Sequence, residues 1–257
     1  MSGQSEFIEV QGRRLEYLRI AGSRSGVPTL VFLHEGLGSV SMWRDFPARV
    51  AHATGCPVVV YSRYGYGRSD VLEEPFTVRY MHEEALAALP EFLERMYIVE
   101  PVLFGHSDGG SIALIHAGAH HRVRALILEA PHVFVEDLSV SSIALAKVSF
   151  ETTDLPGRLA RHHADAEKTF RRWNGIWLHP DFRAWNIEEY LPIVDCPVLA
   201  IQGRDDEYGT VAQLEAIRAR VRGPVELLQL ACCGHSPHRD QPQAVIEAVT
   251  RFVGGLR

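Results

Sequence analysis

Short apolar runs recur along most of the chain and predict the strands of a buried sheet. The runs are continuous rather than alternating, which is typical of strands that are covered on both faces. Residues 7–22 instead alternate around Gly12 and predict an antiparallel hairpin. The continuous runs lie at 29–34, 57–62, 101–105, 125–130, 197–203 and 225–230.

Between these runs, apolar residues fall at the three-to-four-residue spacing of helices. Strands that alternate with helices predict a mostly parallel sheet with helices on both faces, and therefore an α/β fold. Together with the two strands of the hairpin, the apolar runs predict a sheet of eight strands. The helices are expected at 77–97, 110–119, 210–221 and 241–253.

One long stretch interrupts this alternation. It is helical in character and holds three of the four tryptophans. We therefore predict a helical cap at 137–192, inserted into a core domain formed by 1–136 and 193–257. Large aromatic side chains mostly pack against one another, so the tryptophans either hold the insertion together or line a pocket beneath it. Trp173 and Trp177 are the candidates for the pocket.

The composition is typical of a globular protein that binds neither nucleic acid nor a membrane. The 257 residues are 46% hydrophobic and 23% charged, with a formal net charge of −6. No basic stripe is present, no run approaches the roughly 18 apolar residues of a membrane span, and the start does not resemble a signal peptide. We expect a small-molecule substrate, no nucleic acid, no membrane and a cytoplasmic location. Monomer and homodimer both stay open.

The cysteines and histidines do not have the spacing of a disulfide framework or a metal site. None of the four cysteines forms a CxxC motif, and two of them are adjacent. The 13 histidines include the neighbour pairs His120-His121 and His162-His163, whereas a helix-borne zinc site has its histidines at i and i+4. We therefore expect no metal and no cofactor.

The clearest chemical signal is Gly105-His106-Ser107-Asp108-Gly109, a G-x-S-x-G motif between an apolar run and a helix-like stretch. In a sharp strand-to-helix turn, the serine is held in a strained conformation with its hydroxyl exposed. The start of the helix offers free N–H groups to a developing negative charge. Ser107 is therefore the predicted nucleophile, and the N–H of Asp108 is predicted to be part of an oxyanion hole.

A serine hydroxyl becomes a nucleophile when a base takes its proton, and the base needs a carboxylate to orient it. His235 lies between the last apolar run and the last helix and is the predicted base, with His238 as the competitor. The chain order Ser, Asp, His places the acid in LAIQGRDDEYG. Asp206 is favoured there and Asp205 is the alternative, because two adjacent acids cannot both point into one site.

These segments together resemble the α/β-hydrolase superfamily over nearly the whole chain. FLHEGLGS is similar to the family's oxyanion loop, SRYGYGRS to its small-residue turn, FGHSDGG to its nucleophile elbow, IQGRDDEYG to its acid loop and CGHSPHRDQP to its histidine loop. The resemblance implies the eight-stranded α/β-hydrolase fold with a helical cap. It places the acid third after the glycine, at Asp206, and the base at His235. The second oxyanion N–H falls on Gly36, or on Leu37 if the alignment shifts by one residue.

One position departs from the family pattern. The family typically has His-Gly in the oxyanion loop, whereas this chain has His34-Glu35. Glu35 is either structural, pairing with an arginine such as Arg63, or it reaches the pocket and binds a polar group of the substrate. A buried carboxylate without a partner is costly, so we expect a partner in both cases.

A serine at the nucleophile position restricts the reaction. Family members that open epoxides or displace halides use an aspartate there, so the resemblance disfavours those reactions. We expect cleavage of a small carboxylic ester, thioester or lactone through an acyl-enzyme. His132 and Phe134 follow a strand end and, with the aromatic residues of the cap, predict a mainly apolar pocket. A carbon–carbon bond hydrolase of ring-cleavage products and a non-catalytic ligand-binding protein are the alternatives.

Overall fold

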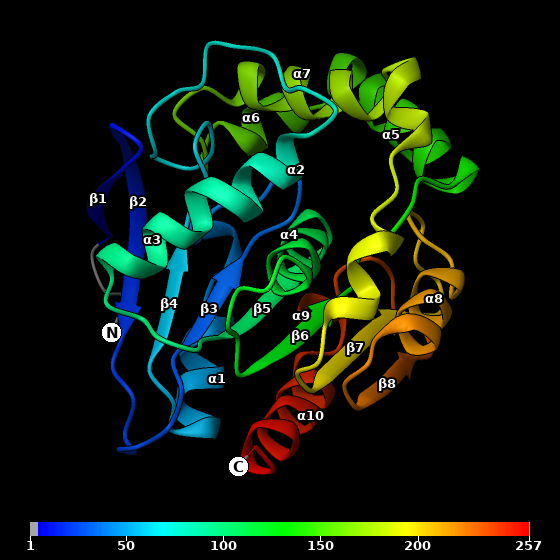
Figure 1. Ribbon diagram of the computed structural model, residues 1–257. Helices are drawn as coiled ribbons and strands as arrows, with labels where there is room; N and C mark the ends of the chain where they lie inside the picture. The colour runs from blue at the N-terminus through cyan, green and yellow to red at the C-terminus, as the bar shows by residue number, and fades with distance from the viewer. Residues whose placement is uncertain (1–4, 257) are drawn as a thin grey trace.

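The computed structural model describes residues 5–256 and contains one eight-stranded sheet, in the order β1-β2-β4-β3-β5-β6-β7-β8 (Figure 1). β1 pairs with β2, and β2 with β4, in antiparallel fashion, and every later pair is parallel. The predicted hairpin and the mostly parallel α/β sheet are therefore confirmed. The strands are β1 (Glu6–Val10), β2 (Arg13–Ile20), β3 (Leu30–Leu33), β4 (Val58–Tyr61), β5 (Val102–His106), β6 (Ala125–Glu129), β7 (Val198–Gly203) and β8 (Val225–Leu230).

Helices cover both faces of the sheet, and a further group of helices lies beyond one end of its strands. α1 and α10 pack together on one face, while α2, α3, α4 and α8 lie on the other. Figure 1 shows α5, α6 and α7 gathered at the top of the view. The helices are α1 (Phe46–Thr54), α2 (Tyr80–Glu83), α3 (Leu89–Arg95), α4 (Asp108–Gly118), α5 (Asp137–Thr152), α6 (Leu155–Leu159), α7 (Ala166–Trp177), α8 (Ala212–Arg220), α9 (Pro237–Asp240) and α10 (Pro242–Gly254).

The alternation of side chains along the central strands divides the core into two layers. In β3, Leu30 and Phe32 face the layer formed with α1 and α10, and Val31 and Leu33 face the layer formed with α4. All four side chains are fully buried. A strand with helices on both faces must be apolar at every position, which is the pattern that identified these strands in the sequence.

Two helical segments differ from the sequence prediction. Helix α1 was not among the predicted helices, although Phe46, Val50 and Ala51 lie at helical spacing and are buried. The helix expected at 77–97 is continuous from Tyr80 to Arg95, but it contains a π-helical stretch at Glu84–Ala88 between α2 and α3. A membrane-crossing helix is not found in the described part of the chain, since none there combines the necessary length and apolar content.

The segment between β6 and β7 forms α5, α6 and α7, followed by two 3-10 turns. In α7, Phe170, Trp173 and Trp177 lie on a shared buried face. Asp165 caps this helix, because its carboxylate accepts a hydrogen bond from the Lys168 amide at 2.9 Å. The segment thus supplies a roof of aromatic side chains, while its status as a separate cap domain stays a prediction.

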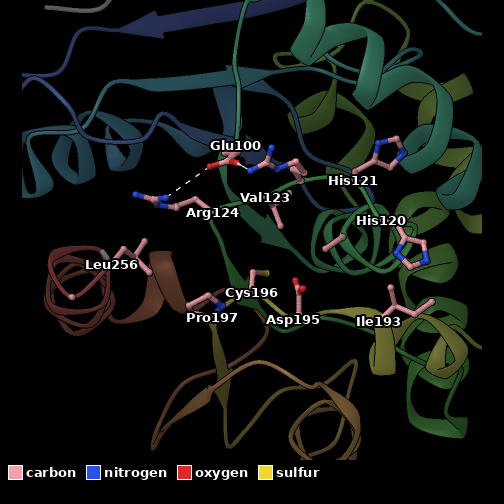
Figure 2. A pocket seen from close by; sticks show the side chains of 13 residues that line it. Glu100, His120, His121, Val123, Arg124, Ile193, Asp195, Cys196, Pro197 and Leu256 are labelled. Carbon is pink, nitrogen blue, oxygen red and sulfur yellow. Dashed lines mark ion pairs between the residues drawn. The ribbon is translucent and has the colours of Figure 1, made fainter.

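A hollow of about 690 Å³ lies beside the residues that precede β5, β6 and β7 (Figure 2). Three of its charged side chains are paired with one another, because Glu100 forms ion pairs with Arg122 and Arg124. In open α/β sheets, ligands bind at the carboxyl ends of the strands. The hollow is at the opposite, amino-terminal ends, so the length of the sheet separates it from Ser107.

Candidate active site

Ser107 stands in the turn between β5 and α4, in a backbone conformation that few residues adopt. Its φ is 52° and its ψ −116°, and its amide donates to the carbonyl oxygen of Glu129 at 2.8 Å. A Cβ atom on Gly105 would lie 2.3 Å from the Gly109 carbonyl oxygen, and one on Gly109 would lie 2.0 Å from that of Leu33. The flanking glycines therefore allow the close backbone approach that presents the serine hydroxyl.

His235 lies between Ser107 and Asp206 and contacts both. Its Nε2 is 2.9 Å from the Ser107 Oγ, and its Nδ1 is 2.8 Å from the Asp206 Oδ1. In this arrangement the imidazole can take the hydroxyl proton, while the carboxylate fixes the tautomer and stabilises the cation. The structure thus brings together the three residues named from the sequence, which follow β5, β7 and β8.

Asp206 is buried and receives several hydrogen bonds. The amides of Tyr208 and Gly209 donate to its Oδ1 at 2.8 and 3.2 Å, and the Gln202 side chain donates to its Oδ2 at 3.2 Å. Burial alone would raise the pKa of Asp206, but the charge of His235 and the hydrogen bonds from His235 and Tyr208 outweigh it. The pKa of Asp206 is therefore below its usual value, and the side chain is held as a carboxylate.

The competing acid and base point elsewhere. Asp205 is exposed at the surface. The Nδ1 of His238 lies 2.6 Å from the Oε2 of Glu129, so this ring is engaged by another buried carboxylate. Neither residue is part of the chain of hydrogen bonds that begins at Ser107.

A cavity of about 240 Å³ adjoins Ser107 beneath the cap helices. His132, one of its walls, is kept neutral, because burial and the nearby charge of His235 lower its pKa to about 3. Phe134, predicted as a pocket residue, is not among the residues that line this cavity: its backbone pairs with Asn186, and its half-buried side chain packs against the core. The other predicted pocket residues do line the cavity: Glu35, His132, Trp173 and Trp177.

Sequence reasoning missed several residues of the cavity wall. Glu207 and Tyr208 are the two residues after Asp206, and Ser236 follows His235, so closeness in the chain to the predicted acid and base would have indicated them. Ile143 and Arg239 come from α5 and α9, and no sequence signal connects them to the site. The missed residues are Ile143, Glu207, Tyr208, Ser236 and Arg239.

The backbone beside Ser107 can receive a negative charge. Asp108 begins α4, and the first N–H groups of a helix have no acceptor within it. Gly36 and Leu37 border the same cavity. A Cβ atom on Gly36 would come within 2.0 Å of the Trp173 Nε1, so only glycine fits under that indole. An oxyanion hole formed by the amides of Asp108 and of Gly36 or Leu37 stays a prediction, and all three residues border the cavity beside Ser107.

Arg63 contacts the loop after β3, which contains Glu35 and Gly36, on the side away from the cavity. Its buried guanidinium donates to the Glu35 carbonyl oxygen at 3.0 Å and pairs with the Asp108 carboxylate at 3.5 Å. The same carboxylate accepts a hydrogen bond from the Tyr80 hydroxyl at 2.8 Å, and that hydroxyl accepts one from the Trp177 Nε1 at 3.1 Å. Polar contacts therefore connect the oxyanion loop, the nucleophile turn and α7.

The partner of the Glu35 carboxylate is not the arginine suggested from the sequence. Its Oε2 lies 3.5 Å from the Nδ1 of His106, whereas Arg63 binds its backbone carbonyl. Burial alone would raise the pKa of Glu35, but the contact with His106 outweighs it and lowers that pKa. Because 23% of the side chain remains exposed and it borders the cavity, Glu35 is both paired and accessible from the cavity.

Comparisons with known proteins agree with this architecture. Residues 30–248 match the model of the "Alpha/beta hydrolase family". The chain is 31% identical over 114 residues to the proline iminopeptidase of Lactobacillus helveticus, which covers 44% of this chain but only 38% of that protein's length. It is 25% identical over 264 residues to the proline iminopeptidase of Lactobacillus delbrueckii subsp. bulgaricus, covering 86% and 88%. The enol-lactonase of Burkholderia xenovorans LB400 superposes with a TM-score of 0.76 at 20% identity, covering 97% and 100%.

Substituting Asp206 by Asn should destabilise the protein at neutral pH and much less in acid. The pKa of Asp206 in the folded protein is below the ordinary 3.8. The stabilisation that its carboxylate provides is therefore fully present above the pKa of the unfolded state, and it is lost as the pH falls through the pKa of the folded state. Denaturant unfolding should show a gap of about 1–3 kcal/mol between wild type and variant near neutral pH.

That gap should narrow as the pH is lowered from about 5 to 3. Asp205→Asn, a change to the exposed neighbour, is the matched control and should stay within about 0.5 kcal/mol of wild type. A gap for Asp206→Asn that does not change with pH would contradict the assignment of an ionised, hydrogen-bonded carboxylate.

Proposed function

This chain belongs to the alpha/beta hydrolase family and is a hydrolase, and we propose that it is a carboxylesterase-like serine hydrolase of small carboxylic esters, thioesters or lactones. The observation that carries the proposal is the unbroken contact from Ser107 through His235 to Asp206, at 2.9 and 2.8 Å. A hydroxyl in that contact can lose its proton to the imidazole as it attacks a carbonyl carbon.

The reaction proceeds in two acyl-transfer steps. His235 takes the proton of Ser107 while its Oγ bonds to the carbonyl carbon, and the amides of Asp108 and of Gly36 or Leu37 stabilise the oxyanion. Collapse breaks the bond to the leaving alcohol or thiol, which His235 protonates. Water then attacks the acyl-enzyme, with His235 again as base, and the carboxylic acid leaves as Ser107 regains its proton.

The cavity favours a small acyl group with an apolar body. Its volume of about 240 Å³ is below the roughly 300–1,000 Å³ of pockets for drug-sized ligands. Ile143, Trp173 and Trp177 provide apolar wall on the side of the cap helices. The size of the cavity and its apolar wall therefore both restrict the acyl group.

The carbon–carbon hydrolase alternative is less well supported. Its substrates carry a carboxylate, which calls for a cationic side chain in the pocket. Arg239 is the one arginine or lysine among the cavity residues of the described chain, and it is exposed at the rim. Glu35 and Glu207 face the same cavity and would repel an anion.

Those two carboxylates favour a second candidate, hydrolysis of amides or esters that carry a free amino group beside the scissile carbonyl. A cationic amine fits a cavity bordered by Glu35 and Glu207. The similarity to the proline iminopeptidase of Lactobacillus delbrueckii, over 86% of this chain, points to the same chemistry. The same nucleophile, base and oxyanion hole would serve, with an amine as the leaving group.

Ser107→Ala should abolish labelling by a fluorophosphonate probe and lower the turnover of p-nitrophenyl acetate by several orders of magnitude, because nucleophile and base act as a unit. The readouts are gel fluorescence of the probe and the release of p-nitrophenol. A wild-type protein that folds but neither reacts with the probe nor hydrolyses the ester would instead support the non-catalytic ligand-binding alternative.

Asp206→Asn should lower kcat by about 10³–10⁴-fold, because the amide leaves the imidazole without its orienting carboxylate and favours the wrong tautomer. Asp205→Asn should change kcat by less than about 2-fold, because Asp205 is exposed and lies outside the hydrogen-bonded chain. Steady-state rates on one aryl ester suffice for the comparison. The reverse ranking would show that the acid is Asp205.

The two candidate functions differ in their response to an amino group. If the enzyme is an esterase, kcat/KM for p-nitrophenyl acetate should exceed that for L-proline p-nitroanilide by at least about 100-fold, because an amide is the harder bond and the apolar wall favours a neutral acyl group. Efficient cleavage of the prolyl anilide, lost on N-acetylation of the proline, would instead establish the second candidate.

A further inference from the structure

His106, the residue before the nucleophile, is buried and joins two loops of the site. It ends β5 behind Ser107, and 1% of its side chain is exposed. Its Nε2 is 2.7 Å from the carbonyl oxygen of His235, and its Nδ1 is 3.5 Å from the Oε2 of Glu35. The ring therefore reaches from the loop that carries His235 to the loop that carries the oxyanion hole.

These two contacts determine where the ring carries protons. A carbonyl oxygen only accepts hydrogen bonds, so the Nε2 of His106 must hold a proton. Its buried Nδ1 has no hydrogen-bond partner within ordinary bonding geometry and faces the Glu35 carboxylate. Burial alone would lower the pKa of His106, but Glu35 outweighs it and that pKa is raised. The ring therefore lies against the carboxylate, with its Nδ1 at ion-pair distance from the Glu35 Oε2.

Other titratable groups face the His106 ring. Glu129 is its register partner on β6, and His238 and His235 come from the segment after β8, with ring centroids 5.0 and 5.2 Å away. Glu129 is already engaged by His238 at 2.6 Å. Glu35 is therefore the carboxylate within ion-pair distance of the His106 Nδ1.

The main chain at His235 needs such support. Its ring must meet Ser107 and Asp206 at once, yet residues 231–236 form turns and bends rather than a strand or helix. The His235 amide donates to the Glu207 side chain at 3.2 Å, and its carbonyl accepts from His106 at 2.7 Å. The second bond fixes this segment to β5, which also carries Ser107.

We propose that Glu35 and His106 are a pair of positioning residues that holds the His235 main chain and the oxyanion loop in register with Ser107 during acyl transfer. The proposal rests on the proposed function of Ser107 as nucleophile. His106 lies outside the cavity wall, so it acts through His235 rather than on the substrate. It also gives Glu35, the residue that replaces the family's usual glycine, a defined task.

The test is a double-mutant cycle of Glu35→Gln, His106→Gln and their combination, with kcat and KM measured on p-nitrophenyl acetate. Each single variant should lower kcat by about 10–100-fold, as losses of orienting partners do, with KM changed by less than about 3-fold. The kcat of the double variant should be no lower than that of the less active single variant, because both substitutions break the same pair. The rate of fluorophosphonate labelling should fall in parallel.

His116→Gln is the matched control. His116 is also buried, and its Nδ1 lies 2.9 Å from the Ala85 carbonyl oxygen, but it is far along α4 from Ser107. This variant should lower thermal stability and leave kcat near that of wild type. A wild-type protein without turnover or labelling would end the proposed function itself, independently of these variants.

Three results would overturn the positioning role. Unchanged kcat with lower stability would make the pair merely structural, a higher KM alone would make Glu35 a substrate contact, and additive losses in the double variant would separate the two residues. If His106→Gln does not fold, Glu35→Asp decides the matter: it keeps the charge and should retain more kcat than Glu35→Gln. Equal losses in the two variants would contradict the pair.

Discussion

The site depends on one imidazole that is bonded on both sides. His235 contacts the Ser107 hydroxyl through one ring nitrogen and the Asp206 carboxylate through the other. Both bonds can form only if three separate loops hold their side chains within about 0.5 Å of the productive geometry. Much of the surrounding structure, from the strained serine turn to the buried His106, serves to keep those loops in register.

The parallel sheet achieves this by bringing strand ends together. Ser107, Asp206 and His235 are far apart in sequence, but they follow strands whose carboxyl ends lie along one edge of the sheet. Polar contacts then fix the loops to one another. Arg63 connects the oxyanion loop to Asp108, and His106 connects the histidine loop to β5. The sheet and these polar contacts thus hold the three residues in place, which the loops could not do without them.

The predictable parts of the molecule were those with local signatures. Continuous apolar runs revealed the strands, and the motif around Ser107 revealed the turn, because both arise from interactions between near neighbours in the chain. The cavity wall depends on which distant side chains meet. Ile143 was therefore missed, and Phe134 was assigned to the pocket although its backbone pairs with Asn186. The partner of Glu35 was unpredictable for the same reason, since His106 approaches it only in the folded chain.

The most direct measurement is the mass of the enzyme during turnover. Reaction with p-nitrophenyl trimethylacetate, whose hindered acyl group slows the second step, should give a burst of about one p-nitrophenol per protein. Quenched protein should carry one trimethylacetyl group, located on the peptide that contains Ser107. Turnover without an acyl group on Ser107, or with the acyl group on another residue, would contradict the account.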